Sequence, residues 1–160
     1  MEDYAIVEAR TGEQVSACRE LFVEYHRTLG VSLCFQGFDA ELASLPGEYS
    51  PPRGRLLLAT RAGASVACGA LRPLFDRDAE MKRLYVRPAH RGSGLGRLIA
   101  TRIIEEARAL GYEALKLDTL PEMHDAQRLY AELGFVETAP YNDNPVDGVR
   151  FLALALAPSA

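Results

Sequence analysis

The chain has 160 residues, 48% of them apolar and 25% charged, which predicts one compact domain over residues 1–160. A net charge of -4, from 18 Lys and Arg against 22 Asp and Glu residues, argues against binding nucleic acid or an anionic membrane through bulk charge. The apolar runs are much shorter than the roughly 20 residues of a membrane span, and the acidic N-terminus lacks a signal-peptide pattern, so we expect a cytoplasmic protein. The three Cys residues lack C-x-x-C spacing, which predicts buried thiols and neither a disulfide framework nor a zinc site.

Hydrophobic periodicity in the first half of the chain predicts a strand at residues 4–9 and then a helix that ends near Gly30. Residues 31–53 are interrupted by Gly and Pro, which predicts a loop-rich wall of a pocket with one short helix at residues 39–45. Three antiparallel strands are expected next, at residues 55–60, 65–71 and 80–86.

The second half begins with a turn at residues 87–96, followed by a long amphipathic helix that reaches Leu110 and is closed by Gly111. A strand is expected at residues 114–118, and the spacing of Thr119-Leu-Pro-Glu122 predicts a capping box at the start of a short helix that ends at Gly134. Strands at residues 135–138 and 149–156 complete the pattern. The order predicts an α/β (α+β) architecture, with a single mixed, mostly antiparallel sheet of about seven strands flanked by helices.

The most informative stretch is the glycine-rich turn Arg91-Gly-Ser-Gly-Leu-Gly96, which precedes the long helix. Glycine allows close backbone approach to a ligand, and a helix N-terminus offers free N–H groups to an anion. Six Lys or Arg residues and no acid lie between Lys82 and Arg102, so we expect a phosphate-rich ligand. The alternative is a tight turn with a solvated basic flank. The P-loop spacing is absent, and a dinucleotide fingerprint would need Gly in place of Arg97, although Asp118 lies where a ribose-binding acid is expected.

The pattern [QR]-x-x-G-x-[GA], filled by Arg91, Gly94 and Gly96, resembles the GNAT superfamily of N-acetyltransferases. The segment 84–100 is similar to the acetyl-CoA motif of that family, and Leu129-Tyr-Ala-Glu-Leu-Gly-Phe135 is similar to its later helix-to-strand motif. The resemblance implies the GNAT fold with acetyl-CoA as the acyl donor, its pyrophosphate on the turn and its pantetheine arm along the preceding strand. The implied cofactor-binding residues are Leu84, Tyr85, Val86, Arg91, Gly92, Ser93, Gly94, Leu95, Gly96 and Arg97.

Two carboxylates are candidates for the base that an amine needs, because alkyl amines have pKa values near ~10.4 and are protonated at neutral pH. Glu80 lies eleven residues before Arg91, a spacing that resembles the general-base glutamate of one branch of the family. Its alternative role is a strand-end carboxylate in solvent or paired with Arg77. Asp118 is the second candidate, with a turn acid beside Thr119 as the alternative.

Tyr130 matches the tyrosine that protonates the departing thiolate in this family, and its alternative role is packing on the buried face of its helix. One departure from the family pattern is Met123, which stands where an Asn often contacts the cofactor arm. His124 beside it is interpreted as a capping or solvent-exposed residue.

Acceptor recognition is assigned to two loops whose aromatic, amide and acidic groups could surround a cationic amine. The alternative is that both loops are ordinary surface turns. The candidate acceptor residues are Phe35, Phe38, Asp118, Tyr141 and Asn144. The resemblance implies an acetyl-CoA-dependent N-acetyltransferase that acts on a primary amine of a small molecule or amino acid by direct attack in a ternary complex, without a metal. The alternative hypothesis is a catalytically silent module that binds or senses acyl-CoA. A homodimer is compatible with a fold of this size.

Overall fold

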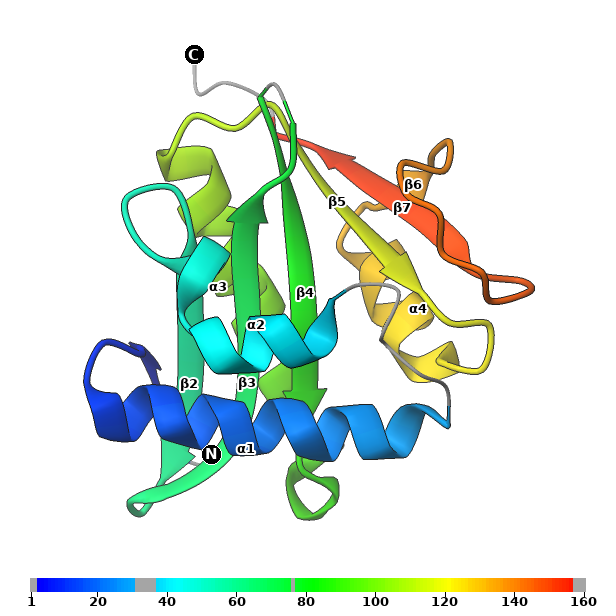
Figure 1. Cartoon of the computed structure of the whole chain (residues 1–160). Helices are drawn as coiled ribbons and strands as arrows, with labels where there is room; N and C mark the ends of the chain where they lie inside the picture. Colours follow the sequence, from blue (N-terminus) through cyan, green and yellow to red (C-terminus); the bar gives the residue numbers. More distant parts are fainter. Residues whose placement is uncertain (1–2, 31–36, 76, 157–160) are drawn as a thin grey trace.

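A single mixed sheet organises the protein in its computed structural model, which describes residues 3–30, 37–75 and 77–156. Its strands lie in the order β1-β2-β3-β4-β5-β7-β6, and β4 and β5 are parallel whereas all other neighbours are antiparallel (Figure 1). The strands are β1 (Ala5–Glu8), β2 (Arg55–Arg61), β3 (Ala64–Pro73), β4 (Asp78–Val86), β5 (Ala114–Thr119), β6 (Val136–Glu137) and β7 (Arg150–Ala155).

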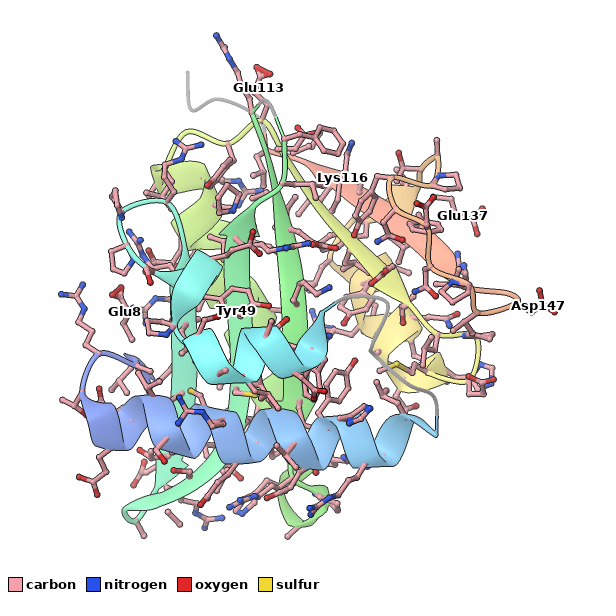
Figure 2. The ribbon with its side chains drawn as sticks, in the orientation of Figure 1. Glu8, Tyr49, Glu113, Lys116, Glu137 and Asp147 are labelled. Carbon is pink, nitrogen blue, oxygen red and sulfur yellow. The ribbon has the colours of Figure 1, made fainter. Side chains whose placement is uncertain are left out.

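Helices cover both faces of the sheet. Helices α1 (Gly12–Leu29) and α2 (Phe38–Ser44) lie on one face, and α3 (Leu95–Ala109) lies on the other (Figure 1). Helix α4 (His124–Glu132) packs with α3 into one apolar core, while α1 and α2 share a second core with the 3-10 turn η2 (Gly47–Tyr49). In that second core Tyr49 is buried between α2 and the sheet (Figure 2).

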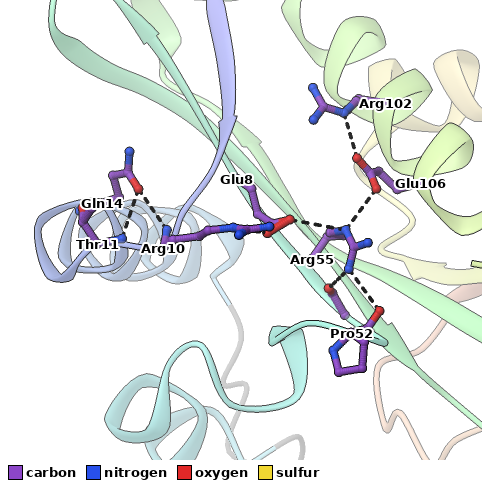
Figure 3. Close-up of polar contacts among 9 residues, drawn as sticks. Glu8, Arg10, Thr11, Gln14, Pro52, Arg55, Arg102 and Glu106 are labelled. Carbon is purple, nitrogen blue, oxygen red and sulfur yellow. Dashed lines mark hydrogen bonds and ion pairs between the residues drawn. The ribbon is translucent and has the colours of Figure 1, made fainter.

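The start of α1 and the neighbouring sheet edge are fixed by polar side chains (Figure 3). Thr11 and Gln14 form a capping box, which satisfies N–H groups that the first turn of a helix leaves unpaired. Arg55 of β2 lies 3.4 Å from Glu8 of β1 and 3.0 Å from Glu106 of α3, so one guanidinium joins two strands and a helix. These contacts attach the C-terminal end of α3 to the sheet.

The strands β4 and β5 part halfway along their length. Their pairing covers only Asp78, Glu80 and the residue between them, although β4 continues to Val86. A bulge at the point where they part gives Arg83 a φ of 59° and shifts the register against β3. Arg83 consequently faces the α1/α2 side, where its guanidinium binds Glu41 of α2 at 2.9 Å. Among the residues that the structure describes, none pairs as a strand with the end of β4 on its β5 side.

The predicted order of elements and the mixed, mostly antiparallel sheet are confirmed, with two local corrections. Thr119 does not cap α4, because it is the last residue of β5 and is buried; α4 begins at His124 without a side-chain cap. The strand expected at residues 135–138 is reduced to Val136–Glu137.

Two further sequence expectations concern cysteine and the membrane. Cys18 and Cys68 are buried free thiols, and Cys34 lies outside the described residues. Within the ranges that the structure describes, no helix has the length and apolar character to cross a membrane, and no group of three or more His, Cys, Asp or Glu side chains is arranged to hold a metal ion.

Candidate active site

A cavity of about 740 Å³ opens where β4 and β5 have parted. Its walls come from the C-terminal half of α1, the end of β4, the glycine-rich turn and the first turns of α3 and α4. The lining residues are Tyr25, Thr28, Leu29, Leu84, Tyr85, Val86, His90, Arg91, Gly92, Gly94, Leu95, Gly96, Arg97, Leu120, Glu122, Met123, His124, Asp125, Ala126, Leu129 and Tyr130. The parted strands therefore frame a cleft that reaches from α1 across to α3 and α4.

The glycine-rich turn forms part of the wall of this cleft. Gly92 and Gly94 have φ angles of 79° and 86°, a region that residues with a Cβ rarely adopt, and a Cβ at either position would meet open space. Ser93 fixes the turn from behind, because its hydroxyl donates to the carbonyl oxygen of His90 at 2.6 Å and accepts from the N–H of Leu95. Helix α3 begins after Gly94 without a side-chain cap, which leaves first-turn N–H groups beyond that of Leu95 available to an anion.

Nine of the ten predicted cofactor-binding residues line the cleft, and the tenth, Ser93, supports the turn. Arg91 donates from Nε to the carbonyl oxygen of Val86 at 2.9 Å, and its guanidinium lies 5.8 Å from the centre of the Tyr85 ring. Arg97 forms an exposed ion pair with Glu132 at 2.6 Å. Cationic side chains therefore flank the glycine turn in the folded protein as they do in the sequence.

Tyr130 of α4 lines the same cleft as the glycine-rich turn. Its side chain is buried and packs edge-on against Phe135, with ring centres 5.7 Å apart. Burial raises the pKa of the Tyr130 phenol, and the charges of Tyr25 and Asp118 raise it further. The phenol therefore stays protonated at neutral pH and is able to donate a proton. Packing and donation are compatible here, because the ring is in the core while Tyr130 also lines the cleft.

Tyr25 is a cleft residue that the sequence did not reveal. It projects from α1 and its ring centre lies 5.7 Å from that of Tyr85. In the sequence Tyr25 occupies one of the apolar positions of α1, where a core role is the natural interpretation. Met123 and His124 also line the cleft, so the position that departs from the family pattern is part of its wall.

Glu80 is enclosed on the α1/α2 side of the sheet and does not line the cleft. Its side chain is completely buried, Oε1 accepts from Arg72 at 2.8 Å and Oε2 accepts from the Tyr141 hydroxyl at 2.6 Å. The alternatives of a carboxylate in solvent or paired with Arg77 are wrong, because Glu80 is buried against Arg72, while Arg77 lies beside Glu113. Each carboxylate oxygen of Glu80 therefore accepts a hydrogen bond from another side chain of the protein.

Asp118 is half-buried at the end of β5, on the same face of the sheet as Glu80. Its Oδ2 accepts hydrogen bonds from the side-chain amides of Asn142 at 3.0 Å and Asn144 at 3.2 Å. Lys82 is buried on this face as well, and burial lowers the pKa of its ammonium while the charge of Glu80 opposes that shift. A polar face that includes both carboxylates thus lies beside the apolar cores.

The structure places the predicted acceptor residues in different environments. Tyr141 and Asn144 contact Glu80 and Asp118, so the loop after β6 lies beside β4 and β5; their role in acceptor binding stays a prediction. Phe38 is instead a core residue that packs against His26 and lies under the Arg83 guanidinium, because it begins α2 on the side facing the sheet. Phe35 lies outside the described residues.

Comparison with known proteins agrees with this architecture. The family model described as Acetyltransferase (GNAT) family matches residues 15–135. An uncharacterised N-acetyltransferase of Schizosaccharomyces pombe is 41% identical over 139 residues, covering 86% of this chain and 85% of the relative.

Solved structures show the same fold. A GNAT-family acetyltransferase of Staphylococcus aureus aligns with a TM-score of 0.82 at 19% identity, over 97% of this chain and 100% of that one. The yncA protein of Salmonella typhimurium, solved with its cofactor acetyl-CoA, aligns with a TM-score of 0.74 at 23% identity, over 99% and 97%. From the family match, the relative and the shared fold, we conclude that the chain belongs to the GNAT family of acetyltransferases and is an acyltransferase.

Proposed function

We propose that the protein is an acetyl-CoA-dependent N-acetyltransferase whose acceptor is the primary amine of a small molecule or amino acid. The observation that carries the proposal is a single continuous cleft, which joins an open glycine turn at the N-terminus of α3 to the buried phenol of Tyr130. A donor with a phosphate-rich end and a reactive thioester on a flexible arm matches a cleft that contains both features.

The residues of the cleft fit acetyl-CoA along its length. The pyrophosphate would lie against the N–H groups of the turn from Arg91 to Gly96, where the helix dipole favours negative charge. The pantetheine arm would follow Leu84, Tyr85 and Val86, because no strand in the described part of the chain pairs with β4 on its β5 side there. The thioester then lies near Tyr130. When bound, acetyl-CoA supplies an activated acetyl group.

Tyr130 is proposed as the acid of the reaction. Negative charge develops on sulfur as the thioester breaks, and a phenol with a raised pKa is still protonated when that charge appears. The sequence hypothesis that Glu80 is the base requires a route through Tyr141, because Arg72 and Tyr141 occupy both carboxylate oxygens. Asp118 is the other carboxylate at the parted strands.

Calorimetric titration of acetyl-CoA, NAD and ATP into separate samples tests the donor. We expect selective binding of acetyl-CoA, followed by thiol release when a panel of small amines and amino acids is added. Preference for NAD or ATP, or no binding of any of the three, would overturn the proposal. Binding of acetyl-CoA without thiol release from any amine would favour the alternative of an acyl-CoA-sensing module.

A further inference from the structure

The cleft extends from one face of the sheet to the other through the gap between β4 and β5. Helices α1 and α3 cover opposite faces of the sheet, and both line this one cavity (Figure 1). The glycine-rich turn and the first turns of α3 and α4 line the part where the proposed function places the donor. The C-terminal half of α1 lines the other part through Tyr25, Thr28 and Leu29. A donor bound beside α3 therefore leaves the α1 part of the cavity for the acceptor.

The wall that α1 contributes to the cavity is made of uncharged side chains. The ring centre of Tyr25 lies 5.7 Å from that of Tyr85, and burial raises the pKa of the Tyr25 phenol to about 12, so this phenol is neutral at pH 7. The Thr28 hydroxyl donates to the carbonyl oxygen of Tyr25 at 2.7 Å, and Leu29 is apolar. The surface offered to the acceptor by this helix is therefore aromatic and aliphatic.

Glu24 and His26, in the same turns of α1, make contacts outside the cavity wall. Glu24 accepts from Arg87 at 3.0 Å and from the Tyr85 hydroxyl at 3.3 Å. His26 packs against Phe38, with ring centres 4.8 Å apart. Neither Glu24 nor His26 is among the lining residues in the described part of the chain. The charge that α1 carries here attaches the helix to the sheet and does not enter the cavity.

The Arg, Glu and Asp residues of the cavity wall belong to the glycine-rich turn, to α3 and to the start of α4; they are Arg91, Arg97, Glu122 and Asp125. The Arg91 guanidinium lies 5.8 Å from the centre of the Tyr85 ring, and its Nε donates to the carbonyl oxygen of Val86. Arg91 also begins the turn that is proposed to hold the pyrophosphate. A carboxylate on the acceptor would compete with the donor phosphates for this guanidinium.

An uncharged wall discriminates between classes of amine. Moving an ionised group from water into apolar surroundings without a partner is costly, whereas an aromatic or aliphatic body is stabilised by burial. An α-amino acid carries a carboxylate next to its amine, and a diamine carries a second ammonium. The amine itself must be neutral to attack the thioester, and an apolar wall favours that form. The α1 side of the cavity thus suits an amine whose remaining atoms are uncharged.

We propose that the acceptor is a primary amine with an aromatic or aliphatic body and no second charged group, bound between α1 and the ends of β4 and β5. The inference rests on the proposed function and selects, within its acceptor class, a small-molecule amine over an amino acid. Tyr25 and Leu29 are then specificity-determining residues, because they form the wall that faces the body of the amine.

Three acceptors that share one ring test the inference on the wild-type protein: phenethylamine, phenylalaninamide and phenylalanine. With rates expressed per concentration of neutral amine, we expect kcat/KM from thiol release to be about 100-fold higher for phenethylamine than for phenylalanine, because the carboxylate loses its hydration without gaining a partner. Phenylalaninamide adds similar bulk without the charge, so its kcat/KM should lie within about tenfold of that of phenethylamine. Pentylamine should exceed 1,5-diaminopentane by about 30-fold for the same reason.

Leu29→Arg places a cation in the proposed acceptor wall, and Leu110→Arg is the matched control. Both leucines are partly buried at the C-terminal end of a long helix, directly before Gly30 or Gly111, which have φ angles of 68° and 86°. Leu110 packs on the α3 core and does not line the cavity. A cation is compatible with a helix C-terminus, so both variants should fold. Leu29→Arg should raise the ratio of kcat/KM for phenylalanine to that for phenethylamine by about tenfold, Leu110→Arg should leave the ratio unchanged, and both should bind acetyl-CoA within about threefold of the wild-type protein.

A kcat/KM for phenylalanine that equals or exceeds that for phenethylamine would overturn the inference while leaving the proposed function intact. Equal losses with phenylalaninamide and phenylalanine would also contradict it, because bulk and not charge would then decide. The same change of ratio in Leu29→Arg and Leu110→Arg would remove α1 from acceptor selection. Failure of the wild-type protein to bind acetyl-CoA, or to release thiol with any amine, would overturn the proposed function as well.

Discussion

The cleft and the polar face meet at the parting of β4 and β5, yet they are built in different ways. The glycine-rich part of the cleft is one contiguous segment of the chain. Its shape is set by backbone geometry, because Gly92 and Gly94 have positive φ angles. The polar face is assembled from side chains that are distant in the chain, such as Tyr141 and Glu80, which are 61 residues apart. We infer that the donor site is encoded locally, whereas the proposed acceptor site depends on the fold being complete.

The largest expected effect is at Tyr130, the proposed acid in the cleft. Tyr130→Phe removes the proton donor but keeps the ring that packs against Phe135. We expect turnover at saturating substrates to fall by about 100-fold, with acetyl-CoA affinity nearly unchanged. Because its raised pKa keeps the phenol protonated, ionisation of Tyr130 should not depress the wild-type rate between pH 7 and about 10. Unchanged turnover in Tyr130→Phe, measured by thiol release, would remove Tyr130 from the acid role.

The next effect tests the local construction of the donor site. Gly94 and Gly111 both have a φ of 86°, but Gly94 belongs to the turn and Gly111 follows α3. Valine at either position should destabilise the fold similarly, by about 1–3 kcal/mol, because a β-branched residue is strained at positive φ. Only Gly94→Val should weaken acetyl-CoA binding, by about 30-fold. Calorimetry and thermal unfolding of both variants check this, and equal binding losses would contradict a specific role for the turn.

Tyr141→Phe addresses the polar face alone. It removes the donor to the buried Glu80 carboxylate, which should cost about 1–3 kcal/mol of unfolding free energy. Tyr112→Phe is the matched control, since the buried Tyr112 hydroxyl donates to the carbonyl oxygen of Arg53, away from the proposed acceptor site. Both variants should lose stability in urea unfolding, but only Tyr141→Phe should raise the KM for the amine, by about tenfold. An equal KM for the amine in the two variants would show that the loop does not contribute to acceptor binding.

The smallest effect is expected for the exposed cation at the cleft. Arg97→Gln removes a guanidinium whose partner, Glu132, is also exposed, and solvent-exposed pairs contribute only about 0–1 kcal/mol. We expect acetyl-CoA affinity to fall by about threefold at low salt and the difference to fade at high salt, as screening predicts. Arg77→Gln, at the far Arg77–Glu113 pair, should leave the affinity unchanged. A loss for Arg97→Gln that persists at high salt would indicate a direct, desolvated contact.

The sequence predicted the locally encoded donor site better than the polar face, which is assembled from distant residues. The strands and long helices could be predicted from hydrophobic periodicity. The glycine-rich turn could be recognised because its residues are contiguous in the sequence. The burial of Phe38 and the partner of Glu80 could not be predicted, since both depend on how distant elements pack. The capping-box interpretation of Thr119 failed because pairing with β7 extends β5 through that residue. Asn142 and Asn144 were visible as loop amides, but their shared partner was not.

Acetyl-CoA affinity, measured by calorimetry for the wild-type protein, Gly94→Val and Asp118→Asn under one condition, tests the division between donor and acceptor regions most directly. We predict that the wild-type protein and Asp118→Asn bind acetyl-CoA equally, while Gly94→Val binds about 30-fold more weakly. Equal weakening in Asp118→Asn and Gly94→Val, or no acetyl-CoA binding by the wild-type protein, would contradict the account.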